Sequence, residues 1–68
     1  MSIKITNIQL KKINNITNII YTILINNNIT LNLTKHYKNN KFKHYALVDY
    51  SIITAKLYKQ IINLIWKQ

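Results

Sequence analysis

Lysines, histidines and aromatic residues are concentrated in one stretch of the sequence, residues 35–49. Lysine side chains attract phosphate groups and displace their counterions, and flat rings can stack on unpaired bases. The stretch contains no acidic residue before Asp49. This pattern favours contact with a nucleic acid; the alternative is a basic loop that only keeps a small domain soluble. The residues that could make the contact are Lys35, His36, Tyr37, Lys38, Lys41, Phe42, Lys43, His44 and Tyr45.

The composition argues against an enzyme. Acid–base and two-metal mechanisms need paired carboxylates, and Asp49 is the only acid in the chain. Cysteine is absent, and two histidines without nearby carboxylates do not form a zinc site. We therefore expect no enzymatic activity, no metal, no other cofactor and no small-molecule substrate. With ten lysines and a net charge of +9, the chain should instead bind a polyanion, either nucleic acid or an anionic membrane.

The chain is short enough that its own core is marginal. Its 68 residues form one domain at most, and a domain of this size buries only about 60% of the surface that its unfolded chain exposes. Small domains often gain the missing stability from disulfides, a metal or a partner, and here a partner remains. Because the net charge also opposes compaction, we predict that the chain does not fold before it binds.

Asparagine-rich breaks divide most of the chain into strand-like segments. Glycine and proline are absent, and asparagine is the best remaining residue for a backbone with positive φ. The sequence therefore predicts a first break bracketed by Asn14-Asn15 and Asn18, a hairpin turn at residues 26–28 and a second turn at residues 39–40. Between them it predicts a strand or extended segment over 2–13 (where a helix also fits), a buried strand over 19–25, a half-buried strand over 29–34 and another strand over 41–48.

Regular alternation in the segment 41–48 would divide its side chains between two faces. One face would carry His44, which could be either an interior histidine or one that faces a ligand. The predicted groups are Phe42, His44, Ala46 and Val48 on one side, and Lys41, Lys43, Tyr45 and Leu47 on the other.

The end of the chain fits two structures. An apolar stripe at helical spacing predicts an amphipathic helix. The same residues also fit a strand over 51–58, a turn at residues 59–60 and a last strand that ends at Trp66. Periodicity slightly favours the helix, whereas the β-branched residues favour strands. The stripe consists of Ile53, Leu57, Ile61, Leu64 and Ile65.

A membrane partner is not expected from the sequence. The longest uncharged span, residues 13–34, contains seven asparagines, whose amides would be costly to place in hydrocarbon. Residues 1–16 lack the compact apolar core of a secretory signal. Abundant Ile, Asn, Lys and Tyr, together with the absence of Gly, Pro and Arg, correspond to AT-rich codons. This bias predicts an organelle (plastid-like or the mitochondrial matrix) or the cytoplasm of a reduced-genome bacterium.

Several segments of residues 18–68 match degenerate motifs of one ribosomal protein family. Residues 29–35 are similar to an apolar strand that ends in a basic residue, and residues 21–27 resemble a first strand and turn with a hydroxyl at Thr22. Lys43, Tyr45 and Asp49 match a Lys-Lys-Tyr-x-x-His-Asp segment, and Trp66 lies where a tryptophan is often found. On these motifs the chain resembles the bacterial-type ribosomal small-subunit protein 17 family.

The sequence also departs from that family. The family's His-Pro-x-Tyr-Gly loop is replaced by the shorter segment 35–40, and its Gly-Asp and Arg-Pro-Leu-Ser-Lys signatures have no clear counterpart. Residues 1–16 match no part of it.

The resemblance implies a mainly β fold and a ribosomal role. Residues 17–68 would form a small OB-like five-stranded barrel within a single domain over residues 1–68, with residues 1–16 as an extension or first strand and the C-terminal segment as a strand. The protein would be a structural component of the small ribosomal subunit, in contact with ribosomal RNA and neighbouring ribosomal proteins. The resemblance implies phosphate contacts for Lys35, Lys38, Lys41 and Lys43, sugar or base contacts for His36, Tyr37 and Tyr45, and a second basic patch at Lys56 and Lys59.

A second hypothesis treats the chain as a small basic accessory subunit of an organellar membrane protein complex. In that case residues 53–68 would form an amphipathic helix on a membrane or a partner helix, with Trp66 at the interface. This hypothesis gives no role to the alternating strand 29–34 or to the basic stretch.

Overall fold

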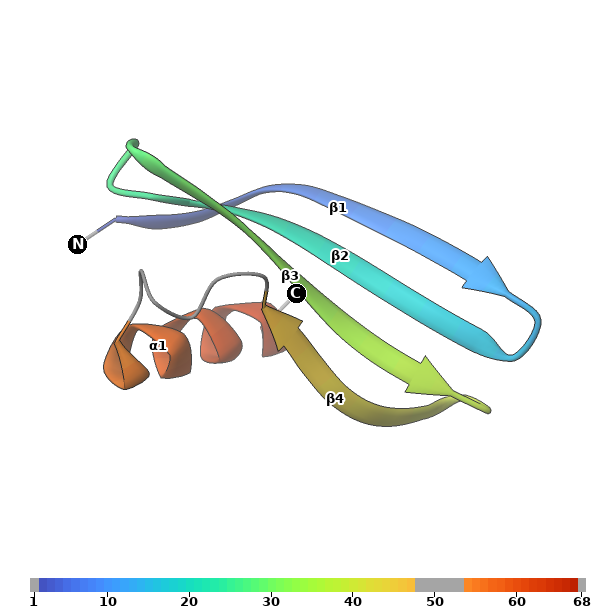
Figure 1. Cartoon of the computed structure of the whole chain (residues 1–68). Coiled ribbons are helices and arrows are strands. Elements are labelled where there is room, and N and C mark those ends of the chain that lie inside the picture. Colours follow the sequence, from blue (N-terminus) through green and yellow to red (C-terminus); the bar gives the residue numbers. More distant parts are fainter. Residues whose placement is uncertain (1, 48–53, 68) are drawn as a thin grey trace.

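The described residues form an open four-stranded antiparallel sheet with one helix packed against it (Figure 1). The computed structural model describes residues 2–47 and 54–67. Each strand pairs with the next one along the chain, so the sheet order is β1-β2-β3-β4. The elements are β1 (Ile3–Ile13), β2 (Ile16–Ile25), β3 (Ile29–Lys38), β4 (Lys41–Leu47) and α1 (Ala55–Trp66).

Asparagines form the three turns of the sheet. The turns at residues 26–28 and 39–40 are as predicted, whereas the first break is shorter than predicted, because β2 already begins at Ile16 and includes Asn18. Asn14 begins the first turn with φ 56°, and the second contains Asn26 and Asn27 with φ 53° and 55°. Asn39 and Asn40, with φ 54° and 63°, form the third turn. Two consecutive residues with positive φ produce the backbone twist that suits a tight hairpin. In a chain without glycine, asparagine therefore takes over the left-handed backbone positions.

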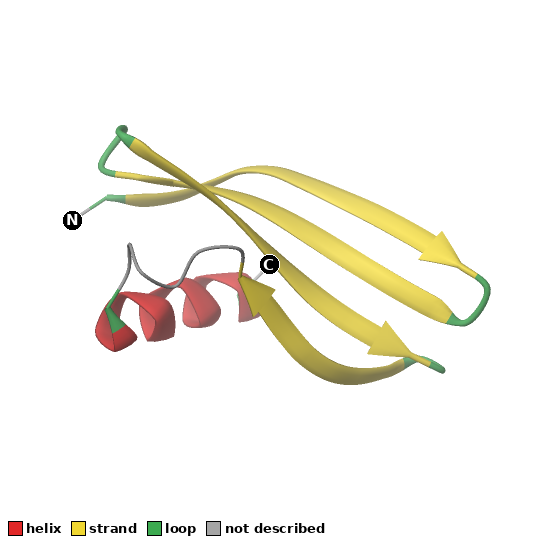
Figure 2. Ribbon diagram, viewed as in Figure 1, coloured by secondary structure: helices red, strands yellow, loops and turns green. Residues whose placement is uncertain are grey.

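The strand pairing gives the sheet two faces, which we call the helix face and the open face. Figure 2 shows α1 on one side of the sheet. The helix face carries Tyr21, Ile23 and Ile25 of β2. Along each strand, successive side chains point to opposite faces, except at two irregularities in the pairing. The first irregularity shifts the register of β1 between Ile5 and Asn7. The second shifts the register of β4, because His36 pairs with His44 while the next residue, Tyr37, pairs with Phe42.

The core lies between the helix face and α1. α1 begins after Thr54, whose hydroxyl oxygen accepts a hydrogen bond from the Leu57 amide at 3.2 Å and so caps the helix. Every third or fourth helix residue then faces the sheet. The buried apolar residues are Tyr21, Ile23, Ile25, Leu31, Leu33, Leu47, Leu57, Ile61 and Ile65.

The helix covers only part of the sheet's length. Twelve helical residues span about 18 Å, whereas the ten residues of β2 span about 34 Å. The turns after β1 and after β3 therefore extend beyond α1 at one end of the molecule (Figure 1). On this end of the helix face Ile8 and Leu10 are 49% and 64% exposed.

The mainly β prediction is confirmed, and so is the helical interpretation of the C-terminal segment. The alternative of strands over 51–58 and up to Trp66 is wrong for residues 55–66, because Leu57, Ile61 and Ile65 recur at helical spacing on the side that packs against the sheet. The described residues form an open sheet, and a closed five-stranded barrel is not shown. Ile53 of the predicted stripe and Val48 of the predicted strand lie outside the described residues.

The predicted division of β4 into two faces is corrected by its irregularity. Lys43 is the extra residue opposite the junction of His36 and Tyr37, so the alternation is displaced by one position. Phe42 consequently shares the helix face with Tyr45, and their ring centroids lie 4.8 Å apart. Lys41 shares the open face with His44, because their partners Lys38 and His36 are two residues apart on β3.

Candidate nucleic-acid interface

The strand register places basic and polar side chains, together with two isoleucines, in two adjacent rows across the open face. The first row runs Lys11, Asn18, His36, His44 across β1 to β4. The second row, nearer the turns, runs Ile13, Ile16, Lys38, Lys41. Neighbouring strands are about 4.8 Å apart, and alternate residues on a strand are about 6.8 Å apart. These eight residues, here called the open-face site, therefore form one continuous surface.

Two imidazoles lie side by side in the first row. The ring centroids of His36 and His44 are 4.9 Å apart, and their planes are tilted by 31°. Nδ1 of His36 lies 2.6 Å from the side-chain oxygen of Asn18. Because an amide oxygen only accepts, this contact requires a hydrogen on Nδ1, and in the neutral tautomer that carries it there, Nε2 of His36 is the acceptor. Asn18 thereby fixes the orientation of His36, which is partly buried, whereas His44 is exposed.

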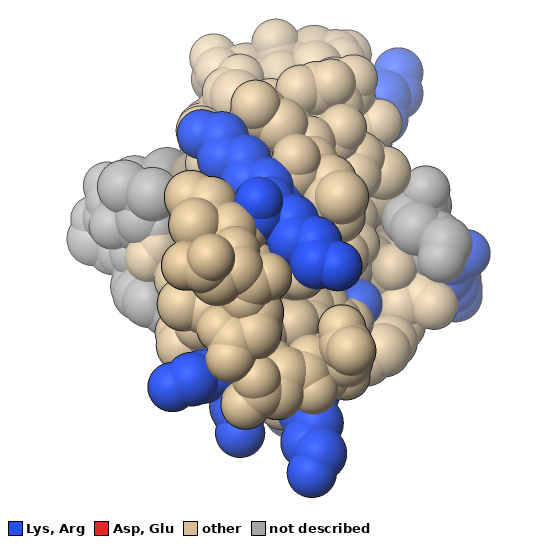
Figure 3. Space-filling view, turned by 90° about the vertical axis from the view of Figure 1, so that its right-hand side faces the viewer, with Lys and Arg blue, Asp and Glu red and all other residues tan. Residues whose placement is uncertain are grey.

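Among the described residues, lysines surround the imidazole pair and no acid lies beside it. Lys11, Lys38 and Lys41 are all exposed, and Asp49, the only acid of the chain, lies outside the described residues. Figure 3 looks onto the end of the molecule that carries two of the hairpin turns and shows lysine side chains spread across it. A surface of this kind has a positive potential and attracts polyanions.

A hollow lies beside the histidine pair at the β1–β2 end of the open-face site. Its volume is about 200 Å³, and its lining consists of Lys11, Ile13, Ile16 and Asn18. Ile13 is 71% exposed. A mainly apolar recess with a few polar groups at its side is the usual composition of a small binding pocket. A larger hollow of about 410 Å³ lies at the opposite end of the molecule, near Ile3 and the end of α1.

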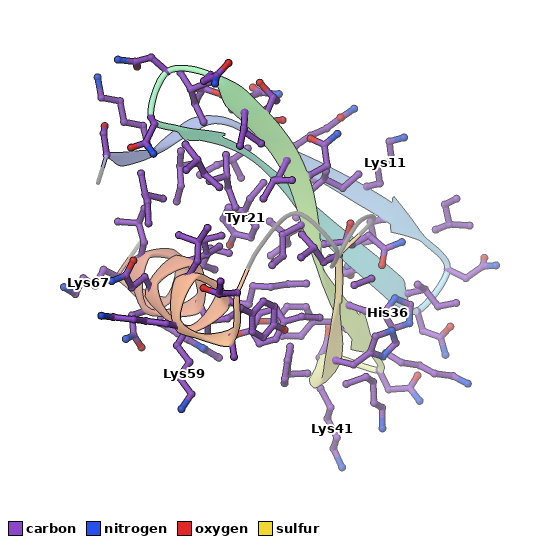
Figure 4. The ribbon with its side chains drawn as sticks, turned by 60° about the vertical axis from the view of Figure 1, so that its left-hand side comes forward. Lys11, Tyr21, His36, Lys41, Lys59 and Lys67 are labelled. Atoms are coloured by element: carbon purple, nitrogen blue, oxygen red, sulfur yellow. The ribbon has the colours of Figure 1, made fainter. Side chains whose placement is uncertain are left out.

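The structure divides the site residues predicted from the sequence between the two faces. His36, Lys38, Lys41 and His44 belong to the open face. Lys35, Tyr37 and Tyr45 belong to the helix face, and Lys43 is the extra residue of the β4 irregularity. Lys56 and Lys59 lie exposed on α1. Figure 4 shows Lys11 and His36 projecting from the sheet away from α1, while Lys59 and Lys67 project from the helix and Tyr21 points between the two layers.

Lys35 lies among aromatic rings at the end of α1. Its Nζ is 4.0 Å from the ring centroid of Trp66 and 5.5 Å from that of Tyr37. Phe42 contacts Tyr37, Tyr45 and Trp66 at centroid distances of 5.8, 4.8 and 6.1 Å. Lys35 is only 6% exposed, so cation–π attraction supports its buried charge. This lysine has a structural role in the described conformation and is not part of the open-face site.

Tyr45, which packs beside these rings, has a raised pKa. Burial raises the pKa of Tyr45 above its usual value of 10.0, and the positive charge of Lys35 opposes part of that rise. The Trp66 indole also acts to lower the pKa, but the hydroxyl, which is buried, has no partner at hydrogen-bond geometry among residues 2–47 and 54–67. In this conformation Tyr45 therefore lies on the helix face with a buried hydroxyl and is not an exposed base-stacking ring.

Sequence reasoning missed the contribution of β1 and β2 to the site. Neither Lys11 nor Asn18 was among the residues predicted from the sequence to make the contact, and Asn18 was expected in the first break and not on a strand. The available signal was the pair Asn14-Asn15: a tight turn there, instead of a break that extends to Asn18, pairs Ile13 with Ile16 and hence Lys11 with Asn18. In the part of the chain that the structure describes, no three His, Cys, Asp or Glu residues form a group that could hold a metal ion.

Comparison of the chain with models of protein families, with curated proteins and with solved structures finds no match in any of the three. The role of the open-face site is therefore argued from its geometry and charge.

Proposed function

We propose that the protein binds RNA through the open-face site, as a structural component of the small ribosomal subunit of an organelle or a reduced genome. The observation that carries the RNA-binding part is the two-row arrangement on the open face. Lys11, Lys38 and Lys41 surround a pair of imidazoles on a surface that α1 does not cover. Lysines supply salt-sensitive phosphate attraction, and the rings and amides supply contacts to sugars and bases.

The ribosomal part of the proposal is supported by the net charge of +9, by the AT-biased composition and by the motif resemblance described above. The corresponding family fold is a five-stranded barrel, which would need one strand more than the four observed. Ribosomal RNA and neighbouring ribosomal proteins are the proposed partners, and Lys56 and Lys59 would form a separate basic patch on α1. The apolar patch at Ile8 and Leu10 suits contact with a neighbouring protein.

The alternative role, in a membrane complex, required a free amphipathic helix. The apolar residues Leu57, Ile61 and Ile65 of α1 are buried against the sheet, so in this conformation they do not offer a surface to lipid. No helix in residues 2–47 and 54–67 has the length and apolar character needed to cross a membrane.

The test is the binding of the purified chain to small-subunit ribosomal RNA over a series of salt concentrations. Each phosphate contact contributes about −0.7 to −0.9 to the slope of log K against log salt. The variant Lys38→Ala/Lys41→Ala should flatten the slope by about 1.4 to 1.8. The matched control Lys56→Ala/Lys59→Ala removes the same charge from α1 and should change the slope by less.

Two results would contradict the proposal. Equal flattening by both double variants would show that binding follows total charge and not the open-face site. Equal affinity for unrelated RNA of the same length would remove the ribosomal part of the proposal and leave general RNA binding.

A further inference from the structure

The open-face site contains two imidazole rings in tilted contact, and one of them is exposed. His36 is held on one side by the Asn18 oxygen at 2.6 Å and on the other by the His44 ring at 4.9 Å. His44 is exposed and lies on β4, the last strand of the sheet. Because His44 is exposed, another flat ring could pack against it on the side away from His36.

The neighbouring residues provide what a single strand of nucleic acid needs. Lys38 and Lys41 lie in the adjacent row, and Lys11 lies at the far end of the histidine row, so phosphates can be neutralised on both sides of the rings. The apolar recess formed by Ile13 and Ile16 offers a second place for a base. Proteins that bind single strands combine these two features, a basic track and stacking surfaces.

A duplex would use the same surface less well. In a base-paired helix the flat faces of the bases are covered by their neighbours, and recognition depends on backbone and groove contacts. The sheet presents the imidazole pair on a strand surface that α1 leaves uncovered (Figure 4). Imidazole rings therefore gain little stacking energy from a duplex, whereas the lysines attract the phosphates of either form.

We infer that the open-face site selects unpaired RNA over duplex RNA, with an unpaired base stacked on His44 and Asn18 acting as the positioning residue for His36. This inference rests on the proposed RNA-binding function and adds the structural class of the ligand. The Nε2 acceptor of His36, fixed by Asn18, can receive a hydrogen bond from a 2′-hydroxyl or a base amino group.

The experiment measures fluorescence anisotropy of the full chain with three labelled RNAs of equal length and sequence. One is single-stranded, one is the same strand in a duplex, and one is single-stranded with abasic sites, which keep the phosphates but lack bases. The wild-type chain should bind the single strand roughly 5- to 150-fold more tightly than the abasic strand, because one stacked base contributes about that factor. The duplex should bind more weakly than the single strand at equal phosphate concentration.

Substitutions at the exposed ring separate stacking from charge. His44→Ala should lose roughly 5- to 150-fold in affinity for the single strand and little for the abasic strand. His44→Phe should retain most of the affinity because it keeps a flat ring. His44→Lys should lose affinity for the single strand, although it adds a positive charge, because it lacks a flat ring. Circular dichroism of each variant verifies the sheet, and the abasic comparison uses the wild-type chain, so it does not depend on any variant folding.

The outcomes distinguish the inference from the proposed function. If the wild-type chain binds none of the RNAs at low salt, the proposed function fails and the inference fails with it. If it binds single-stranded, duplex and abasic RNA equally, RNA binding stands and the inference is wrong. Rescue by His44→Lys together with failure of His44→Phe would also overturn it, since charge and not stacking would then carry the contact.

Discussion

Tyr45 shows how one residue links the core to the chemistry of the surface. Its ring packs against Phe42 on the helix face, while its buried hydroxyl lacks a hydrogen-bond partner among the described residues. A buried polar group without a partner carries a desolvation cost of about 1–3 kcal/mol. The ring therefore contributes to stability and the hydroxyl opposes it.

We predict that Tyr45→Phe leaves the free energy of unfolding unchanged or raises it by about 1 kcal/mol at neutral pH. Chemical denaturation followed by circular dichroism, in a buffer with enough salt for the isolated chain to fold cooperatively, measures this change. Tyr37→Phe is the matched control, because it removes a hydroxyl from the same aromatic cluster at a partly exposed position. A loss of more than about 1 kcal/mol in the Tyr45 variant alone would mean that the hydroxyl has a stabilising partner after all.

The raised pKa of Tyr45 also predicts a dependence on alkaline pH. Because the folded-state pKa lies above the unfolded value of 10.0, the unfolded chain loses this proton first as the pH rises. The neutral phenol therefore contributes stability that is complete below pH 10 and is lost as the pH passes through the raised pKa. Above pH 10 the wild type should therefore lose stability relative to Tyr45→Phe, which has no phenol to ionise. A constant difference across that range would contradict the burial of this group.

Lys35 marks the limit of sequence reasoning at the residue scale. Its position in a run of basic residues predicted an exposed phosphate contact, but β3 places it on the helix face, 6% exposed and under Trp66. That contact joins residues far apart in the sequence and depends on how α1 packs. The neighbours of Lys35 in the sequence do not contain this information.

At the scale of elements, local chemistry determined what could be predicted. The turns were predictable because asparagine tolerates positive φ by itself, and three strands and the helix followed from periodicity. The irregularities in β1 and β4 were not predictable, because an extra residue in one strand is recognised only against its partner. That single shift in β4 separates Lys41 and His44 from Phe42 and Tyr45, and it decides which side chains belong to the open-face site.

The turn between β3 and β4 offers a direct test of the role of asparagine. Asn40 has φ 63°, so Asn40→Ala should lower the free energy of unfolding by roughly 1 kcal/mol, because a Cβ is disfavoured in this region. Asn40→Gly should be neutral or slightly stabilising. Thermal unfolding of both variants measures the effect. Asn28→Ala is the control, since Asn28 is in a turn without a positive φ; equal losses at Asn28 and Asn40 would contradict the argument.

At the scale of the whole molecule, charge and core size oppose each other. The net charge of +9 repels itself in the compact state, while the core consists of one face of a small sheet and one side of a 12-residue helix. Salt screens that repulsion over a distance of about 10 Å at 0.1 M. Added salt should therefore raise the stability of the folded chain and weaken its binding to RNA.

We expect no cooperative thermal transition for the isolated chain at low salt, and a transition that appears when salt or RNA is added. Salt acts by screening the lysines, and RNA acts by binding the folded state. Circular dichroism during heating, with and without a short single-stranded RNA, measures both effects. A cooperative transition at low salt without RNA would show that the core is sufficient by itself.

The order of the strands has a consequence for how quickly the molecule can form. Every strand pairs with its neighbour in the chain, so each sheet contact closes a short loop, and the contact order is low for a β protein. Single hairpins form in about 1–10 μs, and each could form during synthesis as soon as its second strand has been made. The helix face, however, stays uncovered until α1 has been completed at Trp66. The docking of α1 would therefore be the last step of folding, and until then a nascent chain would expose the side of the sheet that later becomes its core.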